Sequence, residues 1–179
     1  NAAGVKVLYY DAGGLETGFD LTFATTHDWE HLQHRMLRMW HDWPSDDREE
    51  IANTWFRNRQ THAEPGIEAF LEFQEIGNLD GLPDADLLVV FFSSSPDEIA
   101  ELDLDWTQYH GSQPQALGAL AKAVQSTPGA QLVVRTHPHM RLKPPLDHVD
   151  WRAAVALAGP AVHFDADAPV DSYALMRAA

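Results

Sequence analysis

Hydrophobic residues follow two different periodicities along the chain, and the change between them falls near residue 80. In the first part, apolar side chains recur three or four positions apart, which is the spacing of one face of an α-helix. The first helix is predicted from Trp29, Leu32, Met36, Met39, Trp40 and Trp43. Pro44 ends it, and Ile51 and Trp55 are predicted to form the core side of a second helix. Residues 66–76 predict a third helix.

After residue 83 the pattern changes to strands that alternate with helices. Leu87–Phe92 is continuously apolar, as expected for a strand buried on both faces, and residues 131–135 predict a second buried strand. Helical spacing returns at Gln113–Gln125 between them, and Val162–Phe164 predicts a third strand. Alternating strands and helices predict a parallel sheet with right-handed crossovers. The expected fold is therefore α/β, with a Rossmann-like sheet preceded by a mainly helical segment.

A turn-rich stretch, residues 77–83, separates the two patterns. We therefore place a domain boundary there, with 1–82 as the helical segment and 83–179 as the start of the sheet domain. Three predicted strands are fewer than the five or more that a doubly wound sheet usually has. The chain, which begins with Asn1, is accordingly expected to be a fragment whose open sheet edge allows a homodimer.

Composition narrows the functional classes. The 179 residues carry 12 basic and 27 acidic side chains, a formal net charge of −15, and such a charge repels nucleic acid. The chain has no cysteine, which excludes disulfides and cysteine–zinc sites and fits a reducing cytoplasm. No apolar run approaches the roughly 20 residues of a transmembrane helix, so we expect a cytoplasmic protein without a transmembrane segment.

Basic residues gather in one place despite the acidic composition. Residues 135–143 hold three of the 12 basic side chains and two histidines, and they begin at the carboxyl end of a predicted strand. Ligands of open α/β sheets bind at that edge. Arg135 and His137 are therefore candidates for binding a phosphate, because their N–H groups can donate to its oxygens. A solvated surface loop in which Arg135 pairs with an acid explains the same residues equally well.

Three serines at residues 93–95 follow the first predicted strand and lead to a predicted helix start at Pro96. A hydroxyl-rich loop ahead of a helix N-terminus can bind an anion. Helix capping is the plainer interpretation, because Ser95 and Glu98 have the spacing of a capping box. The acidic side chains of Asp97 and Glu98 would also repel a phosphate.

A second set of side chains offers a different chemistry. His137, His139, His163 and Asp165 are the ligand types of a metal-dependent hydrolase. The chain is shorter than the roughly 250 residues of the barrel that such hydrolases use. Pro138 is also expected to turn the first two histidine rings apart. We therefore expect neither a transition metal at these residues nor a cofactor.

Four stretches of the chain stand in an order and spacing that match a known family. They are residues 92–98 (Phe-Ser-Ser-Ser-Pro-Asp-Glu), Ser112-Gln113 with Ala116-Leu117, residues 133–138 (Val-Val-Arg-Thr-His-Pro), and residues 165–176. From about Val5 to its end, the chain thereby resembles bacterial capsule polysaccharide biosynthesis proteins with the two-domain GT-B glycosyltransferase architecture.

The resemblance implies transfer of a sugar from a nucleotide-sugar donor to a polysaccharide acceptor, and it implies that His137 contacts the donor phosphate. Relatives continue past the position of Ala179 with a further phosphate-binding loop, and their catalytic base is expected from the N-terminal domain. The chain alone is therefore expected to be inactive, and its catalytic residue is not predicted. A truncated, non-catalytic binding module is a third alternative beside the hydrolase. The predicted nucleotide-sugar site consists of Ser93, Ser94, Arg135, His137 and Ser172.

Overall fold

A computed structural model of the chain describes residues 9–11, 20–22, 29–42, 45–61, 71–94, 111–143 and 150–179. The chain divides into two compact units, Asn1–Glu68 and Ala69–Ala179. The turn-rich stretch at residues 77–83 lies inside the second unit, so this compact unit begins earlier than the change of sequence pattern. Among the described helices, none is long and apolar enough to cross a membrane.

In the described residues of the first unit there are two short antiparallel strands and two α-helices. β1 (Tyr9–Asp11) pairs antiparallel with β2 (Asp20–Thr22). α1 spans Trp29–Asp42, and α2 spans Arg48–Gln60 after a 3₁₀ turn, η1, at Ser45–Asp47. The two helices that the sequence predicts before residue 62 are therefore present.

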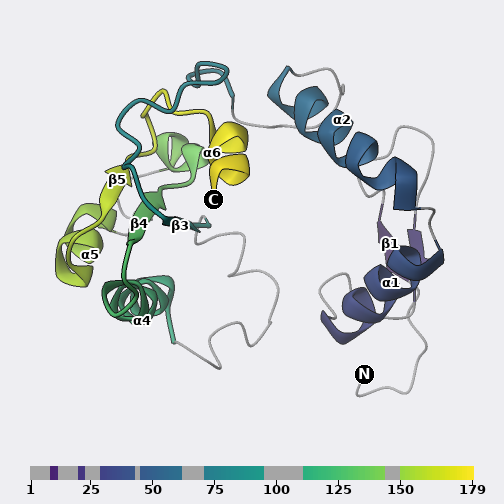
Figure 1. The fold of residues 1–179 in the computed structure, drawn as a ribbon, viewed down its shortest axis with the longest axis horizontal. Helices are drawn as coiled ribbons and strands as arrows, with labels where there is room; N and C mark the ends of the chain where they lie inside the picture. Colours follow the sequence, from purple (N-terminus) through teal and green to yellow (C-terminus); the bar gives the residue numbers. More distant parts are fainter. Residues whose placement is uncertain are drawn as a thin grey trace. The chain divides into compact units, whose positions relative to one another are not determined.

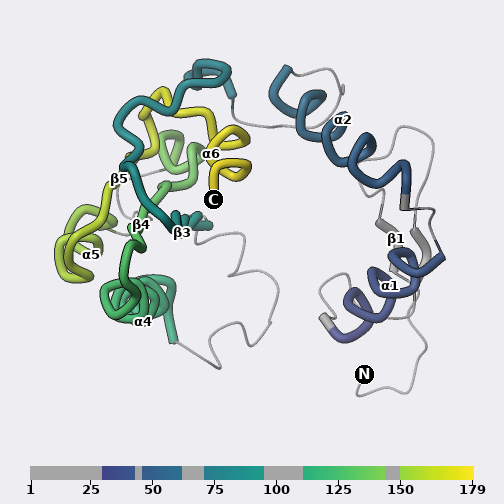
Figure 2. Tube along the Cα trace, viewed as in Figure 1, coloured from purple at the N-terminus to yellow at the C-terminus, as the bar shows by residue number. Residues whose placement is uncertain are grey.

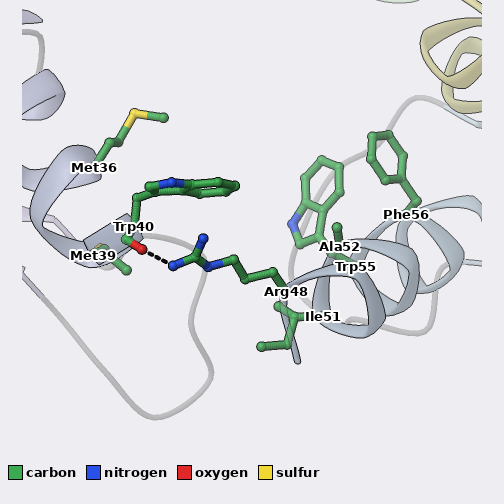
Figure 3. Close-up of a pocket in the computed structure, with 8 residues that line it drawn as sticks. All are labelled: Met36, Met39, Trp40, Arg48, Ile51, Ala52, Trp55 and Phe56. Atoms are coloured by element: carbon green, nitrogen blue, oxygen red, sulfur yellow. Dashed lines mark hydrogen bonds between the residues drawn. The ribbon is translucent and has the colours of Figure 1, made fainter. Parts of the chain in front are cut away.

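The apolar side chains of these helices line an open groove. Trp40 and Trp55 are 60% and 42% exposed, and Ile51 is also exposed. Arg48 places its guanidinium carbon 3.9 Å from the centre of the Trp40 ring and donates a hydrogen bond to the Trp40 carbonyl (Figure 3). The prediction that Ile51 and Trp55 face a core is therefore wrong, because both side chains are exposed and line a groove of about 560 Å³. Its lining consists of Met36, Met39, Trp40, Arg48, Ile51, Ala52, Trp55 and Phe56.

The second unit is built on a three-stranded parallel sheet in the order β3–β4–β5 (Figure 1). β3 spans Leu87–Phe92, β4 spans Ala130–Arg135 and β5 spans Val162–Phe164. Along the chain, α4 (Gln113–Gln125) lies between the first two strands and α5 (Trp151–Ala158) between the last two. The α/β fold class is confirmed, and so is the predicted parallel pairing of the first two strands.

Helices cover both faces of this sheet. α4 and α5 pack on one face, where Leu117 and Trp151 meet Val89 and Phe91 of β3 and Val134 of β4. α6 (Ser172–Ala178) packs on the other face. There, Leu175 and Val170 join Val133, Phe164, Leu88 and Val90 in a second cluster. The two clusters use alternate residues of β3 and β4, because successive side chains of a strand point to opposite faces.

Side-chain caps define where the helices of this unit begin. Ser112 accepts a hydrogen bond from the Gln115 N–H at the start of α4, and Asp150 accepts one from Ala153 at the start of α5. The turn before β4 depends on Gly129, whose φ of +74° is a conformation that residues with a side chain rarely adopt. A Cβ there would also lie 2.4 Å from the Asp86 carboxylate.

Residues 71–82, near the start of the second unit, form no helix. The predicted third helix is therefore wrong over residues 71–76, which form turns, and residues 66–70 lie outside the described ranges. This segment runs beside the chain that enters α6, as the teal and yellow parts of the tube show (Figure 2). Glu75 N–H donates to the Pro169 carbonyl and Asp171 N–H to the Asn78 carbonyl, both at 2.9 Å. Hydrogen bonds to a distant segment replace the helical ones.

Candidate functional site

The three strands end together at the carboxyl edge of the sheet. Phe92, Arg135 and Phe164 are paired in register. The next residues along each strand, Ser93, Thr136 and Asp165, therefore emerge side by side. Both serines, Arg135 and His137 of the predicted site are at this edge, which is where open α/β sheets bind their ligands.

Ser93 and His137 are joined directly. The Ser93 hydroxyl accepts a hydrogen bond of 2.9 Å from the His137 N–H, and the Ser93 N–H donates to the Arg135 carbonyl at 3.0 Å. Ser93 is only 3% exposed, so its hydroxyl serves to tie the two strand ends together. The predicted proximity of the serine loop and His137 is present in the structure.

Ser94 is bound to the first residue of α4. The Gln113 side chain accepts a hydrogen bond of 2.8 Å from the Ser94 N–H and donates one of 3.3 Å to the Ser94 carbonyl. The N-terminus of α4 therefore lies at the same sheet edge, where its positive end favours an anion. The helix start that was predicted at Pro96, with Ser95 and Glu98 as a capping box, lies outside the described residues.

The imidazole of His137 is oriented by a local hydrogen bond. Its Nδ1 accepts from the His139 N–H at 3.2 Å, at the start of the 3₁₀ helix η2 (Pro138–Leu142). A neutral imidazole whose Nδ1 is an acceptor carries its proton on Nε2. The ring is partly buried, and its Nε2–H is a donor of the same type as those that bind phosphate oxygens.

Arg135 lies on the opposite face of the sheet from Ser93. Its side chain is 1% exposed, and Nε donates to the Ser172 hydroxyl at 3.2 Å. The two other nitrogens donate to the carbonyls of Asp165 and Ala168, in the connection between β5 and α6. Burial lowers the pKa of Arg135 to about 10, although the nearby Asp165 and Asp167 act in the other direction.

The predicted site is therefore two separate groups. Ser93, Ser94 and His137 lie together with α4, whereas Arg135 and Ser172 hold the β5–α6 connection on the α6 face. Strand alternation is the physical reason, because Arg135 is the register partner of Phe92 and shares its face, whereas Ser93 is one residue further on and points to the other face. The expectation that Arg135 and His137 share one phosphate is corrected accordingly. Among the other basic residues of 135–143, Arg141 stacks on the Phe73 ring, with its guanidinium carbon 3.1 Å from the ring centre.

The histidine and aspartate that were considered as metal ligands have protein partners. His163 Nε2 lies 2.9 Å from the Thr136 hydroxyl, and Arg152 binds Asp165 Oδ2 through two nitrogens at 3.0 and 2.7 Å. The rings of His137 and His139 are 6.3 Å apart between centres. Within the described ranges, no three His, Asp or Glu side chains form a group that could hold a metal ion.

Burial and neighbouring charges shift the pKa values of His163 and Asp165. Burial lowers the pKa of His163, and the positive charges of Arg152 and Arg135 add to this effect against the opposing charge of Asp165. For Asp165, burial acts to raise the pKa. The hydrogen bonds from Ala166 N–H and Arg152, with the positive charges of Arg152 and His163, outweigh burial, so the net pKa is lowered. Neutral imidazole and charged carboxylate are therefore the favoured forms.

Comparisons with known proteins found no match: no family model, no curated protein and no solved structure matches this chain. The geometry adds one residue that the sequence did not indicate as part of the site, Gln113. A glutamine as the first residue of a helix, just after its N-cap Ser112, carries no chemical signal by itself. Its role depends on contact with Ser94, 19 positions earlier, which residue spacing does not reveal.

Proposed function

We propose that the chain is part of a capsule-type glycosyltransferase and that its second unit binds the phosphates of a nucleotide-sugar donor. The observation that carries the proposal is the hydrogen bond between Ser93 and His137 at the carboxyl edge of the sheet. It brings together two short stretches that are 44 residues apart in the sequence and that both belong to the family resemblance.

The winding of the sheet supports the same location. From β3 to β5 the chain proceeds in one direction across the sheet, with α4 and α5 on one face. α6 then packs under β3 and β4 on the other face. The change of face thus comes after β5, and α6 returns the chain toward β3, whose carboxyl end carries Ser93 and Ser94. Ligands of open α/β sheets bind beside the carboxyl ends of the strands.

The chemistry available there is that of neutral hydrogen-bond donors. Ser94 has a hydroxyl, His137 has an imidazole N–H, and the start of α4 contributes the positive end of its dipole. Such groups bind phosphate oxygens without requiring a basic side chain. The net charge of −15 repels anions over the chain as a whole, so an anion is expected to bind only where such donors gather.

His137→Ala tests the proposal. The chain is titrated with inorganic pyrophosphate and with a panel of nucleoside diphosphates, and binding is followed by calorimetry. We expect saturable binding by the wild-type chain. The variant should bind at least about tenfold more weakly, because a hydrogen bond to a charged group contributes about 1.5–3 kcal/mol. Its melting temperature should stay close to that of the wild-type protein.

His139→Ala is the matched control, since it removes a neighbouring imidazole while the His139 main-chain N–H that orients His137 remains. It should bind the same ligands with little change. Failure of the wild-type chain to bind any member of the panel would contradict a donor-phosphate site in this unit.

A further inference from the structure

The turn that follows β3 is held from two sides by different elements. Ser93 is bonded to the end of β4 through the Arg135 carbonyl and the His137 N–H. Ser94 is bonded to α4 through the side chain of Gln113. The adjacent residues Ser93 and Ser94 are therefore held by two different elements, β4 and α4.

The Gln113 side-chain amide makes the two hydrogen bonds with the Ser94 main chain that a neighbouring strand would make. An extended residue exchanges one N–H and one carbonyl hydrogen bond with a partner strand. Oε1 and Nε2 of Gln113 make this same pair of bonds, at 2.8 and 3.3 Å. A glutamate lacks the donor, and a methionine of similar length lacks both groups. Because the amide is planar, the two bonds fix the orientation of the Ser94 main chain as well as its position.

We infer that Gln113 is a positioning residue for the phosphate site, an inference that rests on the proposed function. Gln113 does not need to touch the ligand. It holds the Ser94 main chain against the first turn of α4, while Ser93 holds His137. Donors that are already ordered bind an anion more tightly than donors that must be ordered on binding. Loss of the amide should therefore weaken phosphate binding by disordering Ser94.

The test uses the 179-residue chain with Gln113→Met, which removes both hydrogen bonds with little change in size. Inorganic pyrophosphate serves as the probe because it is independent of the donor base. We expect the Kd for pyrophosphate to rise about tenfold. The Ser94 amide should exchange its hydrogen faster in the variant, as measured by NMR without ligand. The matched control is Gln115→Met on the same first turn of α4, where an exposed glutamine is replaced and both measurements should stay unchanged.

A second variant separates positioning from a general loss of stability. Gln113→Glu keeps the acceptor for the Ser94 N–H, loses the donor and adds a negative charge. Below the ordinary glutamate pKa of about 4.3 it regains a donor and loses that charge. We therefore expect its Ser94 amide to exchange more slowly without ligand, relative to that of Gln113→Met at the same pH, as the pH is lowered from 6 to about 4. A role confined to stability would leave this ratio of exchange rates constant.

The outcomes distinguish the inference from the function on which it rests. Equal pyrophosphate affinity in the wild-type chain and in Gln113→Met overturns the positioning role and leaves the phosphate site intact. Absence of saturable binding in the wild-type chain overturns the phosphate site, and the positioning role with it. An unfolding temperature of Gln113→Met far below that of the wild-type chain, with a constant ratio for the glutamate variant, also overturns positioning.

Discussion

At the scale of single residues, the strand register decides which polar side chains share a face. Phe92 pairs with Arg135, so Ser93 stands opposite Thr136 and not opposite Arg135. A slip of one residue would have placed Arg135 on the same face as Ser93. The sequence predicts that both residues stand at the end of a buried strand, because apolar runs end there. It does not reveal the register, and the predicted cluster was divided for that reason.

Arg135 illustrates how a basic residue in a region predicted to bind a ligand can be structural. Its guanidinium satisfies two main-chain carbonyls and the Ser172 hydroxyl within the fold. An arginine that binds a ligand and an arginine that is buried within the fold can both stand at the end of a strand, so the sequence alone does not distinguish them. The deciding facts are its 1% exposure and its location on the α6 face, which only the packed structure provides.

His163 should make the stability of the chain depend on pH. Its pKa is lowered in the folded state, mainly by burial, so the unfolded state binds a proton more readily. The unfolding free energy rises with pH wherever the unfolded state holds more protons, so it decreases as the pH is lowered. The contribution of His163 is therefore complete above the ordinary histidine pKa of about 6.5 and is lost as the pH falls from there toward the folded-state pKa.

His163→Gln should reduce this pH dependence, because glutamine does not titrate. The measurement is the unfolding free energy from urea denaturation at intervals between pH 5 and 8, for the variant and the wild-type chain. The difference between the two should change by at most about 1.4 kcal/mol per pH unit, and only below about pH 6.5. Parallel pH profiles of the two proteins would contradict a lowered histidine pKa.

At the scale of elements, the start of α6 is tied to residues far away in the chain. Asp171 is 2% exposed and accepts hydrogen bonds from the N–H groups of Tyr173 and Ala174 in its own helix. Its second oxygen accepts from Gly77 N–H at 2.7 Å. The adjacent Ser172 N–H donates to the Gln74 side chain at 2.7 Å. One short helix of seven residues is thus held by its cap and by the turn segment together.

Asp171→Ala should therefore destabilise the second unit by about 1–3 kcal/mol, because it removes a helix cap and takes away the acceptor of the part-buried hydrogen bond from the Gly77 N–H. Asp150→Ala is the matched control. Asp150 caps α5 in the same way but is exposed and accepts a hydrogen bond from Ala153, so its loss should cost about 0.5–1 kcal/mol. Urea denaturation followed by circular dichroism measures both. Equal losses would contradict a role for the Gly77 contact.

Helices and strands are predicted correctly where the apolar spacing along the chain agrees with the packing of distant segments, and incorrectly where the two disagree. β3 is continuously apolar and β4 contains Leu132, Val133 and Val134 in succession, and residues of both strands pack into the clusters on the two faces of the sheet. Residues 71–76 have helical apolar spacing, but their polar groups bond to the chain near α6 instead. The tryptophans of α1 and α2 have helical spacing too, yet periodicity cannot distinguish an apolar face that closes from one that lines a groove.

At the scale of the whole molecule, the second unit carries its own core. Both clusters of buried apolar side chains consist of residues after position 78, and they include every strand of the parallel sheet. Leu79 and Leu82, from the turn-rich segment, pack against the cluster on the α6 face. This arrangement makes the position of the domain boundary a testable question, because the predicted boundary and the compact unit assign residues 69–82 to different parts of the chain.

Two shortened chains answer that question. Residues 69–179 keep both clusters and the hydrogen bonds that join Gln74, Glu75, Gly77 and Asn78 with the chain entering α6. We expect this protein to fold cooperatively, with a melting temperature within a few degrees of the corresponding transition of the full chain.

Residues 83–179, which begin at the predicted boundary, should be much less stable than residues 69–179. Removal of the segment uncovers Val133, Phe164 and Leu175, and exposing apolar area costs about 25 cal/mol per Å². It also takes away the partners of Asp171 and of the Ser172 N–H, so we expect loss of cooperative unfolding or aggregation. Differential scanning calorimetry of the two proteins at equal concentration gives the comparison. If both unfold at the same temperature, the turn segment belongs with the first unit, and the boundary near residue 82 is the correct one.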